Sequence, residues 1–282
     1  MEPAMETSTA RRKEMLDLVR AAAWILCLGG IIFALDAILE NYQLASLLFG
    51  VFAIDLLMRG RGLSWDETGQ RTILRSLRTV VAGLLLGSFA LLLAVGVCWA
   101  VGLAEVTFGR PTAMGFGLGL VTPLAQAARD ELLFRGAPLA LLRNKISDRF
   151  TLPFVALLGG APVLLQSNAS WLGIGVVVVS GWIFALAVRA GRGLLLAWGA
   201  HAGWLFMLGA GSRGEVLDVR IGDGLWYPLM FAEGKAAWVV FGIVVVVAVV
   251  VSVLYASRRV PRNCDGPPST VNFEPRDQSP IT

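Results

Sequence analysis

Residues 128–136 read ARDELLFRG, a cluster of ionisable side chains inside the otherwise apolar run 114–142. A charged residue at the centre of a bilayer costs roughly 2.5 to 3.5 kcal/mol on insertion scales, so such residues face a bundle interior and have partners. Glu131 and Arg135 stand four positions apart on one helical face, in the order that favours an ion pair. The segment therefore predicts a membrane helix with a polar inner face.

The rest of the chain has the composition of a membrane protein. Of its 282 residues, 56% are hydrophobic and 16% are charged, whereas a soluble domain averages about 45–50% apolar and about 25% charged residues. About 20 apolar residues cross a bilayer as a helix, and about eight runs approach that length. The predicted fold class is an all-α polytopic membrane helical bundle with about eight transmembrane helices. The runs are 22–39, 44–58, 80–102, 114–142, 152–167, 172–188, 194–209 and 237–255.

Basic residues predict the orientation, because they gather in loops on the cytoplasmic side. They concentrate after the even-numbered runs, and the loop 212–235 carries a mixture of charges and is expected outside. Both termini are then cytoplasmic, in a multi-pass protein of the cytoplasmic membrane. The inner residues are Arg59, Arg61, Arg71, Arg75, Arg78, Arg143, Lys145, Arg149, Arg189, Arg192, Arg258, Arg259 and Arg262.

These features divide the chain into three parts. Residues 1–21 form a cytoplasmic segment, 22–256 the transmembrane domain, and 257–282 a tail rich in Pro, Asp, Asn and Ser that is expected to be disordered. Because the basic residues border apolar runs, we expect membrane lipid as a partner and no nucleic acid.

The chain has one histidine, His201, in the apolar run 194–209. At the rise of an α-helix, Glu131 lies about 16 Å and His201 about 11 Å from the presumed cytoplasmic ends of their runs, so the two can meet. A carboxylate and an imidazole in a water-accessible cavity are the parts needed for general-base activation of water. The alternatives are a buried polar clasp for the Glu131 cluster and a packing role for His201.

The sequence DELLFRG, from Asp130 to Gly136, resembles the EExxxR motif, often EELLFRG, of the CPBP or Abi-like intramembrane proteases, which include the type II CAAX prenyl endopeptidases. The resemblance covers about 114–208, where 191–206 is similar to the GSLWxxIxxHAxxN region of that family. It implies that Glu131 and Asp130 activate water, that Arg135 holds the acidic pair, and that His201 assists proton transfer or stabilises the tetrahedral intermediate.

The chain departs from the family pattern at three positions. Asp130 replaces a glutamate, which withdraws the carboxylate by about 1.5 Å, one C–C bond, and a misplacement of about 1 Å can cost 100-fold in rate. The family's FxxxH motif has its nearest counterpart in 164–168, with Asn168 at the histidine position and Ala169 nearly as good an alignment. Leu205 stands where the family usually has asparagine or aspartate.

These departures bear on the metal. A catalytic zinc site generally has three protein ligands, and this chain offers His201 and Glu131, with Asp130 and an amide oxygen of Asn168 as poor additions. A divalent metal such as zinc is one expectation. The other is metal-free chemistry in which Glu131 or Asp130 activates water while His201 and Asn168 orient it or stabilise the oxyanion.

The resemblance predicts an intramembrane endopeptidase that hydrolyses a peptide bond of a membrane-associated or lipidated substrate, near the C-terminus of that substrate. A second interpretation is a catalytically impaired homologue that acts as a membrane binding, immunity or scaffold protein. A transporter that uses Asp55, Asp130, Glu131 and Arg135 is a third, against which the absence of inverted repeats counts.

Overall fold

The computed structural model describes residues 3–39, 41–60, 72–110, 112–142, 145–164, 170–191, 193–209, 216–221, 224–225 and 234–258. Helices dominate these residues, and they run α1 (Pro3–Ile38), α2 (Gln43–Arg59), α3 (Ile73–Ala100), α4 (Ala113–Glu131), η1 (Leu132–Gly136), α5 (Ala137–Leu142), α6 (Asp148–Leu164), α7 (Trp171–Gly191), α8 (Leu195–Leu208) and α9 (Lys235–Arg258). The strands are β1 (Glu105–Phe108), β2 (Leu217–Ile221) and β3 (Gly224–Leu225).

Each of the predicted apolar runs corresponds to a helix, and the all-α membrane bundle is confirmed as the fold class. By length and hydropathy, four stretches of the described chain qualify as membrane spans: Met15–Ile38, Ile73–Ala100, Trp171–Ala190 and Lys235–Ser257. α8 is apolar but shorter. The expectation of about eight crossings therefore stays a prediction. The tail from residue 259 onward lies outside the described residues.

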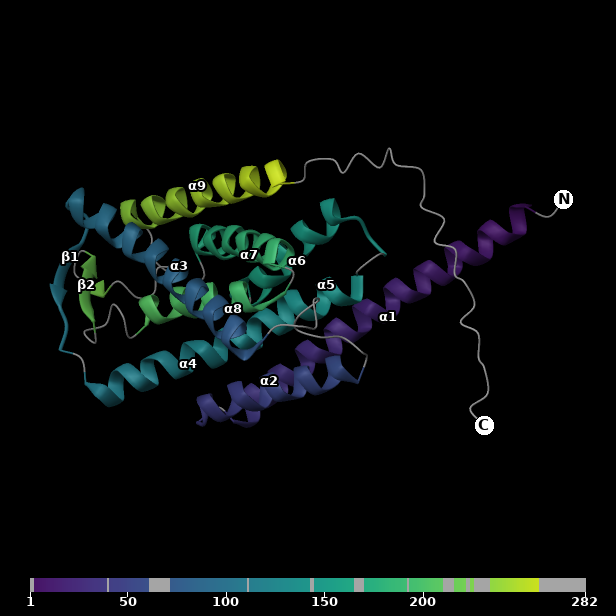
Figure 1. Cartoon of the computed structure of the whole chain (residues 1–282), viewed down its shortest axis with the longest axis horizontal. Coiled ribbons are helices and arrows are strands. Elements are labelled where there is room, and N and C mark those ends of the chain that lie inside the picture. Colours follow the sequence, from purple (N-terminus) through teal and green to yellow (C-terminus); the bar gives the residue numbers. More distant parts are fainter. Residues whose placement is uncertain are drawn as a thin grey trace, which may run out of the picture.

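The helices pack side by side as a bundle, with α8 in contact with α3, α4 and α7 (Figure 1). On one side of this centre α7 packs against α6 and α9, and on the other α4 packs against α2. The start of α1 and the end of α9 lie at the same end of the bundle in Figure 1.

Glycines allow α8 to lie directly on α3. A Cβ added to Gly87 of α3 would meet the carbonyl oxygen of Ala200 at 1.9 Å, and one added to Gly203 of α8 would meet that of Leu84 at 2.1 Å. Gly83 and Gly199 make similar backbone approaches. Small residues at four-residue spacing let membrane helices come this close, and the contact fixes the helix that carries His201.

The fourth predicted span is one rod with a local change of winding. α4, η1 and α5 follow one another without a gap, and η1 is a π-helical segment. π-helical turns occur as single insertions within α-helices, frequently at functional sites. Gly136 closes the segment, where an added Cβ would lie 2.7 Å from Leu194 Cδ1. The start of α8 thus approaches the rod immediately beyond the ionisable cluster.

A small antiparallel sheet was not predicted and corrects the purely helical expectation. β1 follows α3 and pairs with β2, which follows α8, from Glu105 opposite Arg220 to Phe108 opposite Leu217. β3 adds to β2. The residues of β2, LDVRI, alternate apolar and polar as a half-buried strand does, and Val219 is fully buried. The alternation was readable in the sequence, although the charges there favoured an outer loop.

Candidate active site

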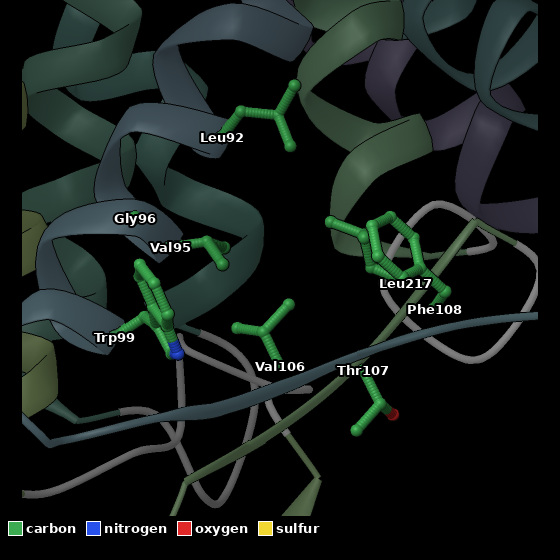
Figure 2. Close-up of a pocket in the computed structure, with 8 residues that line it drawn as sticks. All are labelled: Leu92, Val95, Gly96, Trp99, Val106, Thr107, Phe108 and Leu217. Atoms are coloured by element: carbon green, nitrogen blue, oxygen red, sulfur yellow. The ribbon is translucent and has the colours of Figure 1, made fainter.

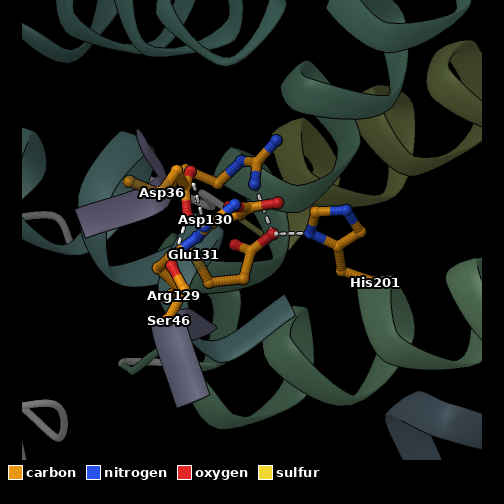
Figure 3. Close-up of polar contacts among 7 residues, drawn as sticks. Asp36, Ser46, Arg129, Asp130, Glu131 and His201 are labelled. Carbon is orange, nitrogen blue, oxygen red and sulfur yellow. Dashed lines mark hydrogen bonds and ion pairs between the residues drawn. The ribbon is translucent and has the colours of Figure 1, made fainter. Parts of the chain in front are cut away.

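The carboxylate of Glu131 is the most deeply buried acidic group in the described chain, with none of the residue exposed. Its Oε1 accepts a hydrogen bond from Arg135 Nη1 and lies 2.9 Å from Nδ1 of His201. In Figure 3 the Glu131 side chain extends toward the His201 ring. The predicted convergence of the two runs is confirmed, because residues 70 positions apart meet at hydrogen-bonding distance.

The position of Arg135 follows from the helical rod and from a gap left by a glycine. Arg135 lies in η1, four residues after Glu131, and both side chains are almost completely buried. Gly159 of α6 faces the guanidinium, since a Cβ built there would be 3.2 Å from Arg135 Nη2. The absence of a side chain at 159 therefore makes room for the cation that neutralises Glu131.

His201 is held on two sides. Its ring stacks on the Phe184 ring of α7, with centroids 5.1 Å apart and planes at 21°. Its Nδ1 faces Glu131 Oε1. An ionised carboxylate only accepts hydrogen bonds, so with Glu131 ionised this contact uses the imidazole tautomer that carries a proton on Nδ1. Nε2 is then the basic nitrogen, available to take a proton.

Two atoms of the site have no hydrogen-bond partner among the described residues: Glu131 Oε2 and Arg135 Nε. Buried polar atoms without partners are few in native proteins, and they mark strain, catalysis or a bound small molecule. The unused acceptor of Glu131 lies on the same carboxylate that contacts His201. The site thus has one acceptor and one donor that no described residue pairs.

Asp130 belongs to a second cluster. Its Oδ1 accepts from Arg129 Nε at 3.2 Å, and Arg129 Nη1 reaches the carboxylate of Asp36 in α1 at 2.9 Å. Ser46 of α2 also donates to Asp36. In Figure 3, Asp36 and Ser46 lie to the left of the Glu131 carboxylate, and His201 lies to its right. Consecutive helical residues point about 100° apart, and the contacts recorded for Arg135 are with Glu131 and Phe184, not with Asp130.

Asn168, the predicted counterpart of the family's second histidine, lies outside the described residues, as does Ala169. The sequence therefore remains the basis for assigning Asn168 to the site. The other predicted residues fall into two groups. Glu131, Arg135 and His201 lie together, whereas Asp130 contacts Arg129.

The donor set does not fit a catalytic zinc ion. Within the described ranges no group of three or more His, Cys, Asp or Glu side chains is placed to hold a metal, and three protein ligands are usual. The Nδ1 of His201 and the Oε1 of Glu131 face each other rather than a common point. Arg135 also places a positive charge on the carboxylate, which opposes the binding of a second cation.

An apolar pocket lies elsewhere, between the end of α3 and the sheet (Figure 2). Its cavity volume is about 410 Å³. It is lined by Leu92, Val95, Gly96, Trp99, Val106, Thr107, Phe108 and Leu217. Because none of these side chains is an acid, a base or a strong nucleophile, the pocket is distinct from the candidate active site.

The fold and the site define a class: a polytopic helical membrane protein with a buried carboxylate and guanidinium and a partly buried imidazole between its helices. Residues 111–207 match the family model described as type II CAAX prenyl endopeptidase Rce1-like. The match covers about one third of the chain and includes Glu131, Arg135 and His201. It confirms the predicted resemblance at nearly the predicted bounds. Neither the curated proteins nor the solved structures gave a match.

Two residues of the site were not predicted. Phe184 lies in a predicted apolar run with nothing in the local sequence to separate it from other core aromatics, and Gly159 is one of 32 glycines in the chain. Their roles depend on contacts with Arg135 and His201, which are remote in sequence. A spacing rule within one helix cannot detect them.

Proposed function

We propose that the protein is an intramembrane endopeptidase of the CAAX-protease type. The observation that carries the proposal is the contact of 2.9 Å between Glu131 Oε1 and His201 Nδ1 in a buried setting with Arg135. A carboxylate that orients an imidazole through Nδ1 and stabilises its protonated form is a recurrent base in hydrolases. The family match over 111–207 supports the same reaction class.

The reaction divides among these residues as follows. Nε2 of His201 takes a proton from a water molecule while the water oxygen attacks the carbonyl carbon of the scissile amide. Glu131 stabilises the imidazolium that forms, and Arg135 holds the Glu131 carboxylate in place. The tetrahedral intermediate then collapses, the C–N bond breaks, and the imidazolium returns the proton to the amine that leaves.

Two further residues keep roles that the sequence assigns. We assign to Asn168 a hydrogen bond to the oxyanion, since an amide side chain can donate to developing negative charge. Asp130 stands at the first acidic position of the family motif and is retained as an alternative group for water activation. Asn168→Asp tests the contact with the oxyanion, and Asp130→Asn tests the alternative role in water activation.

The substrate class follows from the location of the site. Glu131 and His201 lie within a bundle of apolar helices, so the scissile bond must be brought there by a substrate that is itself in the membrane. We propose a lipidated or otherwise membrane-associated peptide cut near its C-terminus. The proposed setting is the cytoplasmic membrane, with both termini of the protein in the cytoplasm and with membrane lipid around the bundle.

Because the donor set does not fit zinc, the proposed hydrolysis proceeds without a metal. Water activation rests on Glu131 and His201, with Asp130 as the alternative carboxylate, and no step requires a Lewis acid. Treatment with chelators tests this part of the proposal separately from the peptidase activity itself.

The decisive experiment uses the full-length protein in proteoliposomes with a quenched fluorescent peptide that carries an isoprenylated cysteine near its C-terminus. Wild-type protein is expected to cleave it, and Glu131→Gln and His201→Ala to lose about 100-fold or more of the rate. Glu105→Gln is the matched control, because it makes the same exchange on the exposed strand β1. Cleavage at the wild-type rate by both site variants would overturn the proposal.

The rival is a membrane protein that binds such a peptide without cutting it. The contacts of Glu131 with Arg135 and with His201 of α8 fit this rival as a polar clasp between helices. A wild-type protein that binds the peptide with a measurable affinity yet releases no product would favour it. In that case we expect His201→Ala to change the free energy of peptide binding by less than it changes the free energy of unfolding.

A further inference from the structure

Phe184 contacts two members of the site at once. The ring is 7% exposed, it stacks on the His201 ring at 5.1 Å, and Arg135 Cζ lies 5.1 Å from its centroid. With the two contacts of Glu131, these residues form a closed cycle drawn from α4, η1, α7 and α8. We propose that Phe184 is a positioning residue that fixes the plane of the imidazole and so the direction of Nε2. This inference rests on the proposed function.

The need for such a residue follows from the geometry of one hydrogen bond. The Nδ1 contact with Glu131 restrains a single atom of the ring, and the side-chain torsions χ1 and χ2 still allow the imidazole plane to tilt. Such a tilt changes the direction of Nε2, the basic nitrogen. A stacked partner with planes at 21° removes this tilt, at a centroid separation within the usual range of about 4.5–7 Å.

The second contact relates the imidazole to the cation. A guanidinium carbon within about 6 Å of a ring centroid is attracted to the negative face of the ring, and Arg135 satisfies this at 5.1 Å. Phe184 therefore holds Arg135 and His201 at a fixed mutual distance, while Glu131 binds both. The electron-rich ring also favours the positive charge that the imidazole acquires when it takes the proton from water.

The single histidine of the chain gives a direct readout. Protein labelled with ¹³C and ¹⁵N at histidine shows one set of imidazole signals, whose ¹⁵N shifts report the tautomer and whose ring-proton shifts report the stacked phenyl. Phe184→Leu and Phe184→Met remove the ring, and Phe184→Tyr retains it. Phe206→Leu is the control, since Phe206 is 8% exposed on the His201 helix and packs on Phe116 instead.

We expect Phe184→Leu and Phe184→Met to shift the His201 imidazole ¹⁵N signals, because a tilted ring loses the Nδ1 contact with Glu131, and to lower kcat about 10- to 100-fold at unchanged KM, as a misplaced base does. Phe184→Tyr restores both, and Phe206→Leu changes neither. Wild-type imidazole ¹⁵N signals in folded Phe184→Leu or Phe184→Met would overturn the inference. If the wild-type protein cleaves no peptide, the proposed function fails, while the signals still decide whether Phe184 orients His201.

Discussion

Three consecutive residues of α4 serve two clusters that differ in burial. Arg129 contacts both Asp130 and Asp36, and the side chain of Asp36 is 46% exposed. Glu131 contacts Arg135 and His201 instead, and its side chain is 1% exposed. Removing a charge completely from a polar medium has a large desolvation free energy, whereas a charge that stays in contact with that medium has a small one. The comparison separates residues that join α1 and α4 from residues suited to chemistry.

The largest loss of stability is expected from removing the buried guanidinium of Arg135. Arg135→Leu leaves the buried carboxylate of Glu131 without its cation, and breaking a buried pair in this way costs about 3–5 kcal/mol. Arg129→Leu breaks the more exposed pair and is expected to cost about 1 kcal/mol or less. The free energy of unfolding, measured in mixed micelles, gives both losses. Equal losses would show that burial does not distinguish the two clusters.

A smaller loss is expected from crowding the same guanidinium. In Gly159→Ala the new Cβ lies 3.2 Å from Arg135 Nη2, and Arg135 is held by Glu131 and Phe184. Overpacking of this kind costs about 1–3 kcal/mol, and we expect a several-fold loss of cleavage with it. Gly96→Ala, where the Cβ meets nothing within 4 Å, is the control and is expected to be neutral or slightly stabilising.

Asp130→Asn tests which cluster Asp130 serves. Its partner is Arg129, so we expect the cleavage rate to fall by about 10-fold at most. This factor corresponds to roughly 1.4 kcal/mol of activation free energy. The comparison variant is Asp36→Asn, on the far side of Arg129, with an effect of the same size. A loss as large as that of Glu131→Gln would move Asp130 into the catalytic group and join the two clusters.

No effect is expected from removing metal ions. Because the described residues offer Glu131 and His201 rather than three ligands, incubation with EDTA or 1,10-phenanthroline should leave the cleavage rate within about two-fold of its starting value. A zinc peptidase treated in parallel controls for the chelation. Inactivation that added zinc reverses would contradict the metal-free mechanism and point to a ligand outside the described residues.

The sequence was informative wherever one element carried the signal. The run 114–142 and the spacing of Glu131 and Arg135 predicted a helix and an ion pair, and both are present. Helix rise alone placed His201 near the depth of Glu131, because both depths are counted from the cytoplasmic side of the same bilayer. The sheet was missed because β1 and β2 are four and five residues long and lie in loops whose charges suggested exposure.

The sequence by itself determined the membrane class, the helical bundle and the motif that carries the family resemblance, because hydrophobicity and helical periodicity are local properties. The tertiary structure decided which neighbour each charge of 129–131 contacts, where Phe184 and Gly159 lie, and how closely α8 approaches α3. These depend on the way separate helices pack. A residue's direction around its own helix is fixed by winding, but what it meets there is fixed by the helix beside it.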